Sequence, residues 1–310
     1  MALHELVEKP FRLAGRQDSP IQKIAWPAMG TVLTLATILS VFVWMKQGLP
    51  SRLNPGIQKI VSSVQEEHRL RRQAIRWKQC NLHKDFDIND YDIDTCGAVV
   101  PERYNVLVIG DSLAADTYMM LSLTYPEIHF AQATAGGCTA LLDTSYLREE
   151  YTTCIELNRL RFEELARRNM DLVVLASTWT EERIAPLRET LEYLQSLDQS
   201  VLVIGPRAVF PGVAPGRLAK ESSVDGLAQR LQESVVRKEG ILASMRAALP
   251  EAEIVDISGI QCTPHCDVLE VDRLLYLDPQ HFTELGARRI GERFRDNFDL
   301  PGFIEAAKSR

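Results

Sequence analysis

The sequence predicts an α/β protein with a parallel five-stranded sheet, preceded by one transmembrane helix. Short apolar runs alternate with helical patterns from about residue 104 onward, which is typical of a parallel sheet covered on both faces. The first of these runs ends in the tripeptide Gly-Asp-Ser at residues 110–112. A long uncharged segment, residues 24–45, lies near the amino terminus.

Length and composition favour one α/β domain of about 200 residues with an appendage. The chain has 310 residues, of which 45% are hydrophobic and 25% charged, as in ordinary globular proteins. Its formal net charge of −7 argues against a nucleic-acid surface, which would normally be basic. We therefore expect no nucleic-acid partner.

Residues 24–45 are predicted to span a membrane. At 1.5 Å per residue the segment would extend about 33 Å, enough for a hydrocarbon core of about 30 Å. Trp26 and Trp44 lie near its two ends, as interfacial aromatic residues do. A buried helix and a cleaved signal peptide are the alternatives, and the length of the run argues against the latter.

Basic residues predict the orientation of this helix. More of them precede the span than follow it closely, with Lys9, Arg12, Arg16 and Lys23 before it and Lys46 and Arg52 after it. The excess favours a cytoplasmic amino terminus. The protein would then be a single-pass protein of the inner membrane whose body faces the periplasm.

Residues 46–100 are predicted to form a periplasmic linker and stalk. Apolar residues at helical spacing between 54 and 79 indicate an amphipathic helix that packs on the domain or a partner (Ile57, Ile60, Val61, Val64 and Leu70). Five aspartates follow between 85 and 94 and suggest calcium, but the Gly-centred loop with a terminal Glu is missing. A solvated acidic loop is the favoured interpretation.

The remaining chain supplies the elements of the sheet domain. The expected strands are 106–109, 128–133, 171–176, 201–205 and 253–257. The expected helices are 113–123, 155–169, 181–197, 224–248 and 284–298. Right-handed crossovers would bring the carboxyl ends of the strands to one edge, where ligands bind in such folds.

Ser112 is the candidate nucleophile. It would lie between a buried strand and the amino terminus of a helix, where free backbone N–H groups favour developing negative charge. Such a serine needs a base and an orienting carboxylate. Asp278 and His281 supply both types of group three residues apart, just before the last amphipathic helix.

Gly-Asp-Ser near the start of the predicted sheet domain and Asp-x-x-His near its end resemble motifs of the SGNH/GDSL hydrolase superfamily. The resemblance implies a flavodoxin-like three-layer α/β/α fold with Ser112 as nucleophile, His281 as general base and then acid, and Asp278 as its orienting residue. It also implies an oxyanion hole with three donors, namely the serine N–H, a glycine of the family's second sequence block and an asparagine of its third block. Gly137 best matches that glycine, with Gly136 beside it.

The third block of the family, Gly-x-Asn-Asp, is not matched. Ser177-Thr178-Trp179-Thr180 follows the expected strand instead. SGNH domains fused to acyltransferase family 3 membrane proteins also tend to lack this asparagine and carry a tryptophan here. Trp179 therefore points to that subgroup, and it would either face the substrate or pack at the strand end.

A second resemblance concerns the amino-terminal segment. Residues 7–12, Val-Glu-Lys-Pro-Phe-Arg, are similar to the motif that closes the multi-span acyltransferase family 3 domain, and residues 48–53 resemble the segment after the extra span of fused members. The resemblance implies four parts: a cytoplasmic segment (1–23), a transmembrane helix (24–45), the linker and stalk (46–100) and the SGNH domain (101–310).

The six cysteines all lie on the expected outer side of the membrane. Sequential pairing is the simplest of fifteen connectivities and would join Cys80 with Cys96, Cys138 with Cys154, and Cys262 with Cys266. Zinc bound by Cys262, His265 and Cys266 is the rival hypothesis, but structural zinc normally takes four ligands. We therefore expect disulfides, no metal and no cofactor.

Four other polar residues are further candidates for the site. Arg207 could bind an anionic sugar or an acyl carbonyl, although an exposed loop arginine is favoured. His265 is a rival base without a carboxylate partner other than Asp267, and His129 is expected to pack within or at the edge of a strand. Asp111 could orient the serine turn or simply cap it.

The sequence thus predicts a membrane-anchored extracytoplasmic SGNH-type enzyme that acts on acyl esters. The resemblance favours O-acylation, such as O-acetylation, of a cell-surface glycan, with a multi-span acyltransferase family 3 protein as a partner. A stand-alone carbohydrate acetylesterase is one alternative. The other is a glycan-binding or scaffolding domain without catalysis.

Overall fold

The computed structural model describes residues 20–45, 52–145, 147–148, 150–218, 220–221 and 223–309. The chain divides into two units, Met1–Leu53 and Asn54–Arg310, and each is described by itself. Residues 7–12 and 48–51, which carry most of the second resemblance, lie outside the described residues.

The first unit contains one long apolar helix, α2 (Pro20–Met45). Its part Trp26–Met45 is long and apolar enough to cross a membrane. Hydroxyl groups inside this part donate to the carbonyl four residues earlier at 2.7–2.9 Å (Thr31, Thr34, Thr37 and Ser40). These four hydroxyl groups are therefore satisfied within the helix, as a lipid environment requires. Among the residues that the structure describes, one helix is apolar and long enough to span a membrane, as expected.

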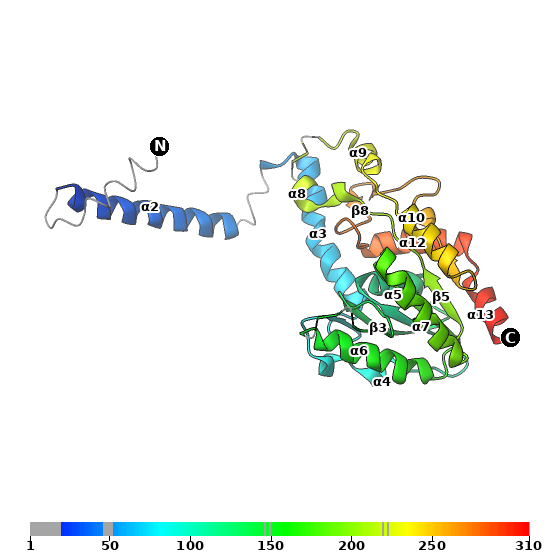
Figure 1. Cartoon of the computed structure of the whole chain (residues 1–310). Coiled ribbons are helices and arrows are strands. Elements are labelled where there is room, and N and C mark those ends of the chain that lie inside the picture. Colours follow the sequence, from blue (N-terminus) through cyan, green and yellow to red (C-terminus); the bar gives the residue numbers. More distant parts are fainter. Residues whose placement is uncertain are drawn as a thin grey trace. The chain divides into compact units, whose positions relative to one another are not determined.

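The second unit is built on a parallel sheet of six strands in the order β1-β3-β2-β4-β5-β6 (Figure 1). The strands are β1 (Asn81–His83), β2 (Asn105–Gly110), β3 (His129–Gly136), β4 (Leu172–Ala176), β5 (Val201–Ile204) and β6 (Glu253–Val255). The expected strand count of five was wrong by one, because β1 has three residues, two of them polar. Its pairing with Thr134–Gly136 is a non-local contact that no local pattern indicates.

Helices cover both faces of the sheet, which confirms the three-layer α/β/α fold. Alternate residues of β2 point to opposite sides: Val106 and Val108 join one apolar core, Leu107 and Ile109 the other. The first core lies against α3 (Pro55–Ala74), α5 (Ser112–Thr124), α12 (Glu284–Asn297) and α13 (Leu300–Lys308). The second lies against α6 (Thr152–Glu163), α7 (Ile184–Ser196) and α10 (Glu239–Ala248).

Two helical expectations need correction. The predicted helix 224–248 is two helices, α9 (Leu227–Glu233) and α10, because Val236 leaves the helical path to form a β-bridge with Val209. Helix α13 was not predicted. It begins at Leu300 after Asp299, whose side chain accepts the N–H of Gly302 and caps the helix.

The range expected to form linker and stalk belongs largely to the compact second unit. The amphipathic helix is present as α3, and Ile57, Ile60 and Val64 are buried in the first core. In the aspartate run, Asp87 and Asp92 cap the short helices η3 (Ile88–Asp90) and α4 (Ile93–Cys96). These carboxylates have a local structural use.

The cysteines pair sequentially, as Cys80–Cys96, Cys138–Cys154 and Cys262–Cys266. Cys262 and Cys266 bond to each other, so the rival zinc hypothesis loses two of its three ligands. Within the described ranges, no group of three or more His, Cys, Asp or Glu side chains is placed to hold a metal ion.

Candidate active site

The turn between β2 and α5 presents Ser112. Gly110 has φ +146°, and a Cβ on it would lie 1.7 Å from the carbonyl oxygen of Ala176, so only glycine fits. The Asp111 carboxylate accepts the N–H of Leu113 at 2.8 Å and caps α5. Ser112 is therefore the first residue of the helix, and its own N–H has no partner within the helix.

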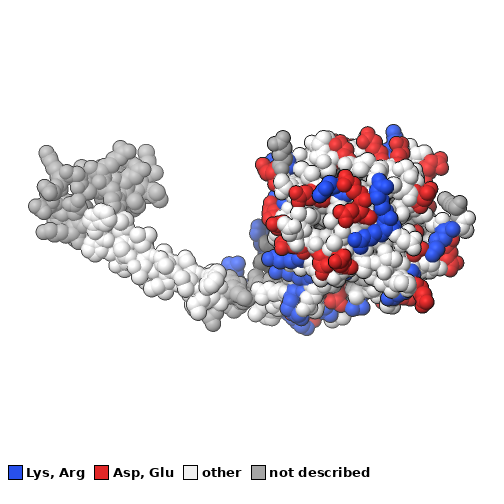
Figure 2. Space-filling model, turned by 90° about the horizontal axis from the view of Figure 1, so that it is seen from below, with Lys and Arg blue, Asp and Glu red and all other residues white. Residues whose placement is uncertain are grey.

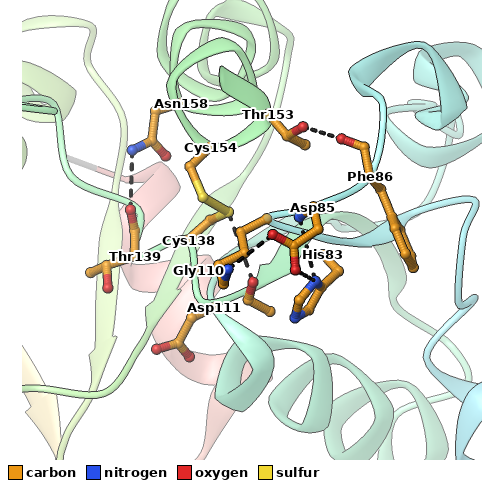
Figure 3. The surroundings of a disulfide bond; sticks show 12 residues. His83, Asp85, Phe86, Gly110, Asp111, Cys138, Thr139, Thr153, Cys154 and Asn158 are labelled. Atoms are coloured by element: carbon orange, nitrogen blue, oxygen red, sulfur yellow. Dashed lines mark hydrogen bonds and ion pairs between the residues drawn. A yellow bond between two sulfur atoms is a disulfide. The ribbon is translucent and has the colours of Figure 1, made fainter. Parts of the chain in front are cut away.

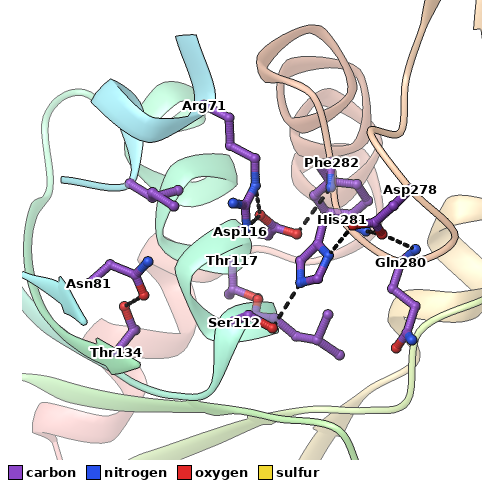
Figure 4. A network of polar contacts seen from close by, with 12 residues as sticks. Arg71, Asn81, Ser112, Asp116, Thr117, Thr134, Asp278, Gln280, His281 and Phe282 are labelled. Carbon is purple, nitrogen blue, oxygen red and sulfur yellow. Dashed lines mark hydrogen bonds and ion pairs between the residues drawn. The ribbon is translucent and has the colours of Figure 1, made fainter. Parts of the chain in front are cut away.

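Ser112, His281 and Asp278 form a continuous hydrogen-bonded chain (Figure 4). The Oγ of Ser112 lies 2.8 Å from Nε2 of His281, and Nδ1 of His281 lies 2.7 Å from Oδ2 of Asp278. The other oxygen of Asp278 accepts the N–H groups of Gln280 and His281 at 2.9 and 3.0 Å. One carboxylate thus orders the whole turn.

The electrostatics of this chain keep Asp278 ionised. Partial burial raises the pKa of Asp278, but the hydrogen bond and charge of His281 and the two backbone N–H groups lower it more, and the net pKa lies well below its usual value. An ionised Asp278 accepts Nδ1–H of His281. Nε2 then carries the lone pair that can accept the hydroxyl proton of Ser112.

Gly137 stands at the neighbouring strand end. Strands β2 and β3 pair from Asn105 with His129 to Gly110 with Thr134, so the turn after β3 lies beside the Ser112 turn. Gly137 is exposed with φ +81°, and Gly136 is the last residue of β3. In the described parts of the chain, the Gly137 N–H donates to no protein group. It is free to serve as an oxyanion donor.

The Cys138–Cys154 disulfide lies beside Gly110 and Asp111 (Figure 3). It ties the turn after Gly137 to α6, and both sulfur-bearing residues are fully buried. Asn158 on the same helix donates to the carbonyl of Thr139 at 3.1 Å. The turn that would stabilise an oxyanion is thereby fixed to a helix.

Arg161, on α6, holds the two strand ends together. It is fully buried, and its guanidinium donates to the carbonyl groups of Gly110 (2.5 Å), Ala133 (2.8 Å) and Cys138 (3.2 Å). Sequence reasoning missed this residue, because an arginine in an amphipathic helical pattern is normally solvent-exposed. No local signal could have identified it.

The segment after β4 is used structurally. The N–H of Thr178 donates to Asp111 at 2.7 Å, and the Asp111 N–H donates to the hydroxyl of Ser177 at 3.3 Å. Trp179 is 1% exposed and its indole donates to the Ile204 carbonyl at 2.7 Å. Its position corresponds to the packing alternative, and contact with a substrate would require Trp179 to leave this position.

Asp116 links the serine helix to the histidine loop. Its fully buried carboxylate accepts Arg71 Nε (2.8 Å), Arg207 Nη1 (2.9 Å) and the backbone N–H of Phe282 (3.0 Å), next to His281. Figure 4 shows Arg71, Asp116 and Phe282 connected in this way beside the triad.

The expectation of an exposed Arg207 was wrong. The residue is 4% exposed, because it also donates to the Leu113 carbonyl and the Thr117 hydroxyl and lies over the ring of Phe282. No sequence pattern indicates this role, since its partners on α5 are about ninety residues away in the chain.

The rival histidines lie elsewhere. His129 has its Nε2 3.0 Å from the Ala98 carbonyl oxygen at the start of β3, at the opposite end of that strand from Gly136. His265 is exposed in the short loop closed by the Cys262–Cys266 disulfide.

Comparison with known proteins gives a family match and structural likenesses to solved chains. Residues 79–296 match the model of the SGNH domain (fused to AT3 domains). No curated protein matches the chain. The solved periplasmic domain of a lipopolysaccharide acetyltransferase from Salmonella ser. Paratyphi A has 16% identity and a TM-score of 0.59, covering 76% of this chain and 98% of that one. At this identity the likeness shows a shared fold.

Proposed function

The chain belongs to the family of SGNH domains fused to AT3 domains, and from this membership we propose that it is a serine-dependent O-acyltransferase of a cell-surface glycan. The family supports an acyl-ester enzyme of the SGNH type. The observation that carries the serine mechanism is the chain of contacts from Ser112 Oγ through His281 to Asp278, at 2.8 and 2.7 Å.

In the proposed reaction, Ser112 Oγ attacks the carbonyl carbon of an acyl donor while His281 Nε2 accepts the hydroxyl proton. The imidazolium, stabilised by Asp278, returns this proton to the leaving oxygen, which departs as an alcohol. An acceptor sugar hydroxyl then gives its proton to His281 and attacks the acyl-enzyme. The new ester forms as the bond to Ser112 Oγ breaks and Oγ recovers the proton.

The backbone N–H groups of Ser112 and Gly137 would stabilise the oxyanion in both half-reactions, the acylation of Ser112 and the transfer to the acceptor. The Thr178 N–H, in the segment after β4, is already engaged with Asp111. Loss of one oxyanion donor typically lowers turnover by about 100- to 1000-fold. We therefore propose a slow enzyme that depends on a well-positioned acceptor.

The proposed setting is the inner membrane. Helix α2 would anchor the chain as a single span with a cytoplasmic amino terminus, and the SGNH domain would face the periplasm with its disulfides oxidised. The proposed parts are a cytoplasmic segment (1–23), the membrane span (24–45), the segment 46–100 and the SGNH domain (101–310), with the segment 46–100 packed into the same compact unit as the domain from Asn54 onward. A multi-span AT3 protein would be the partner that supplies the acyl group.

The test uses the full chain purified in detergent and p-nitrophenyl acetate as acyl donor. Ser112→Ala and His281→Ala should lower turnover about a thousandfold or more, because the two residues act as one unit. Ser196→Ala and His265→Ala are matched controls at exposed positions and should leave turnover unchanged. Equal turnover in Ser112→Ala and wild type would refute the serine mechanism.

Addition of an acceptor glycan separates transfer from hydrolysis. With a transferase, the acceptor should gain acyl groups in proportion to the p-nitrophenol released. Release of p-nitrophenol with all of the acyl group recovered as acetate would instead favour the esterase alternative.

A further inference from the structure

An open groove of about 660 Å³ runs along α3 and the turn that follows it. His68, Arg69, Arg72 and Arg76 line it on one side of the helix, together with Trp77 and three glutamines. The groove residues on α3 lie on the helix face next to its buried face, which includes Val64 and Glu67.

The groove lies close to the triad. His68 interacts electrostatically with Asp278 and His281, and Arg71 of the same helix binds Asp116, one turn after Ser112. At the far end, Arg76 donates to Gln132 of β3 and lies 4.8 Å from the ring centre of Tyr118 on α5. The groove therefore lies on α3 and the turn after it, which contact α5, the helix that begins at Ser112.

The described side chains that line the groove are basic or uncharged. On the face shown in Figure 2, Lys and Arg side chains are interspersed with Asp and Glu. The described residues that line the groove include three arginines and no Asp or Glu, in a chain of net charge −7. A local positive site of this kind attracts anions.

Its arginines can accept a new partner. Arg69 pairs with Glu66 on the exposed side of the helix, and such a pair is weak in water. Arg72 lies 6.0 Å from the ring centre of Trp77. Arg69 and Arg72 are both exposed, so their guanidinium groups can bind a carboxylate or phosphate in a charge-assisted way.

We propose that this groove binds the carboxylate or phosphate group of an anionic acceptor glycan. Guanidinium groups hold the anion, the glutamine amides bind hydroxyl groups, and Trp77 offers an aromatic face to a sugar ring. The glycan so held extends toward Ser112. That the bound glycan is an acceptor rests on the proposed function, whereas binding of the anion in the groove does not depend on catalysis.

The test measures binding by isothermal titration calorimetry, with the full chain in detergent and a Ser112→Ala background that prevents turnover. The probes are tetragalacturonate, its carboxyl-reduced neutral counterpart, mannose 6-phosphate and mannose. Arg69→Gln combined with Arg72→Gln should weaken binding of the anionic probe about tenfold, because the probe loses two exposed ion pairs. Raising the NaCl concentration should weaken it as well.

Arg217→Gln combined with Arg246→Gln removes the same charge from exposed helix positions elsewhere, and should leave binding unchanged. Binding of tetragalacturonate alone assigns a carboxylate, and binding of mannose 6-phosphate alone assigns a phosphate. Equal binding by the groove variant and the control variant overturns the proposal, as does equal affinity for neutral and anionic probes.

Phosphatidylglycerol vesicles provide the last arm. If the groove variant loses vesicle binding while neither anionic probe binds the unmodified groove, the groove faces a lipid surface and the glycan proposal is wrong. Because every arm uses Ser112→Ala, a failure here differs from a failure of the serine mechanism, which appears only in the p-nitrophenyl acetate assay.

Discussion

Asp116 offers a test of how the site is held together, through the variant Asp116→Asn. The carboxylate is fully buried between Arg71 and Arg207, whose side chains are 13% and 3% exposed. The change removes the negative charge and leaves both guanidinium groups beside a neutral amide. Removing one partner of a buried ion pair destabilises a protein by about 3–5 kcal/mol, because the remaining charge is uncompensated.

Thermal unfolding followed by circular dichroism measures this effect. For a unit of this size each kcal/mol lowers Tm by about 2–4 °C, so Asp116→Asn should melt roughly 6–20 °C below wild type. The matched control is Asp272→Asn, which breaks the exposed ion pair of Asp272 with Lys59. Lys59 lies on α3, the helix that also carries Arg71. An exposed pair contributes at most about 1 kcal/mol, so this control should melt within a few degrees of wild type.

The opposite result would refute the reasoning. If Asp116→Asn melts as little below wild type as the control does, the two arginines find other compensation and the network does not hold the site. Combining Asp116→Asn with Arg207→Met separates charge from packing. The second change should recover part of the lost stability, because it removes one of the uncompensated charges.

Three further predictions concern the proposed triad and the turn that carries Gly137. Asp278→Asn should lower Tm most above about pH 4 and progressively less below it. The pKa of Asp278 is lower in the folded than in the unfolded protein, so ionised Asp278 stabilises the fold above the unfolded pKa, and this stabilisation is lost on acidification. A constant difference in Tm down to pH 2 would contradict this. Replacing Cys138 and Cys154 together by serine should destabilise the fold by about 3 kcal/mol in chemical denaturation, since the bond closes a short loop; an unchanged midpoint would argue against it. Arg161→Lys should lower p-nitrophenyl acetate turnover about tenfold or more, because an ammonium cannot reach three carbonyl groups at once; Arg159→Lys, exposed on the same helix, should not.

The elements that the sequence predicted are those whose signal is local. Strand β2 is recognisable in the sequence because apolar residues dominate it, and all six of its residues are buried in the structure. The Ser112 turn is recognisable because a glycine and a capping aspartate are both required there. Strand β1 has no such signal, since its three residues are ordered by pairing with β3.

Arginines that are buried or partly buried limit what the sequence could predict here. Arg71, Arg161 and Arg207 look like surface residues in any local window, and the rule that arginines stay exposed holds unless they are paired. Apart from Asn158, three positions before Arg161, their partners lie 23 to 94 positions away along the chain (Gly110, Leu113, Asp116, Thr117, Ala133 and Cys138). Such pairing becomes visible only after the chain has folded.

These arginines also explain why two loops 169 positions apart meet at hydrogen-bonding distance. Asp116 lies one turn after Ser112, so any movement of α5 moves both residues together. Because the same carboxylate accepts the N–H of Phe282, the loop that carries His281 moves with them. The motif residues therefore identify the groups that we propose to react, whereas a buried charge network without a motif fixes the distance between them.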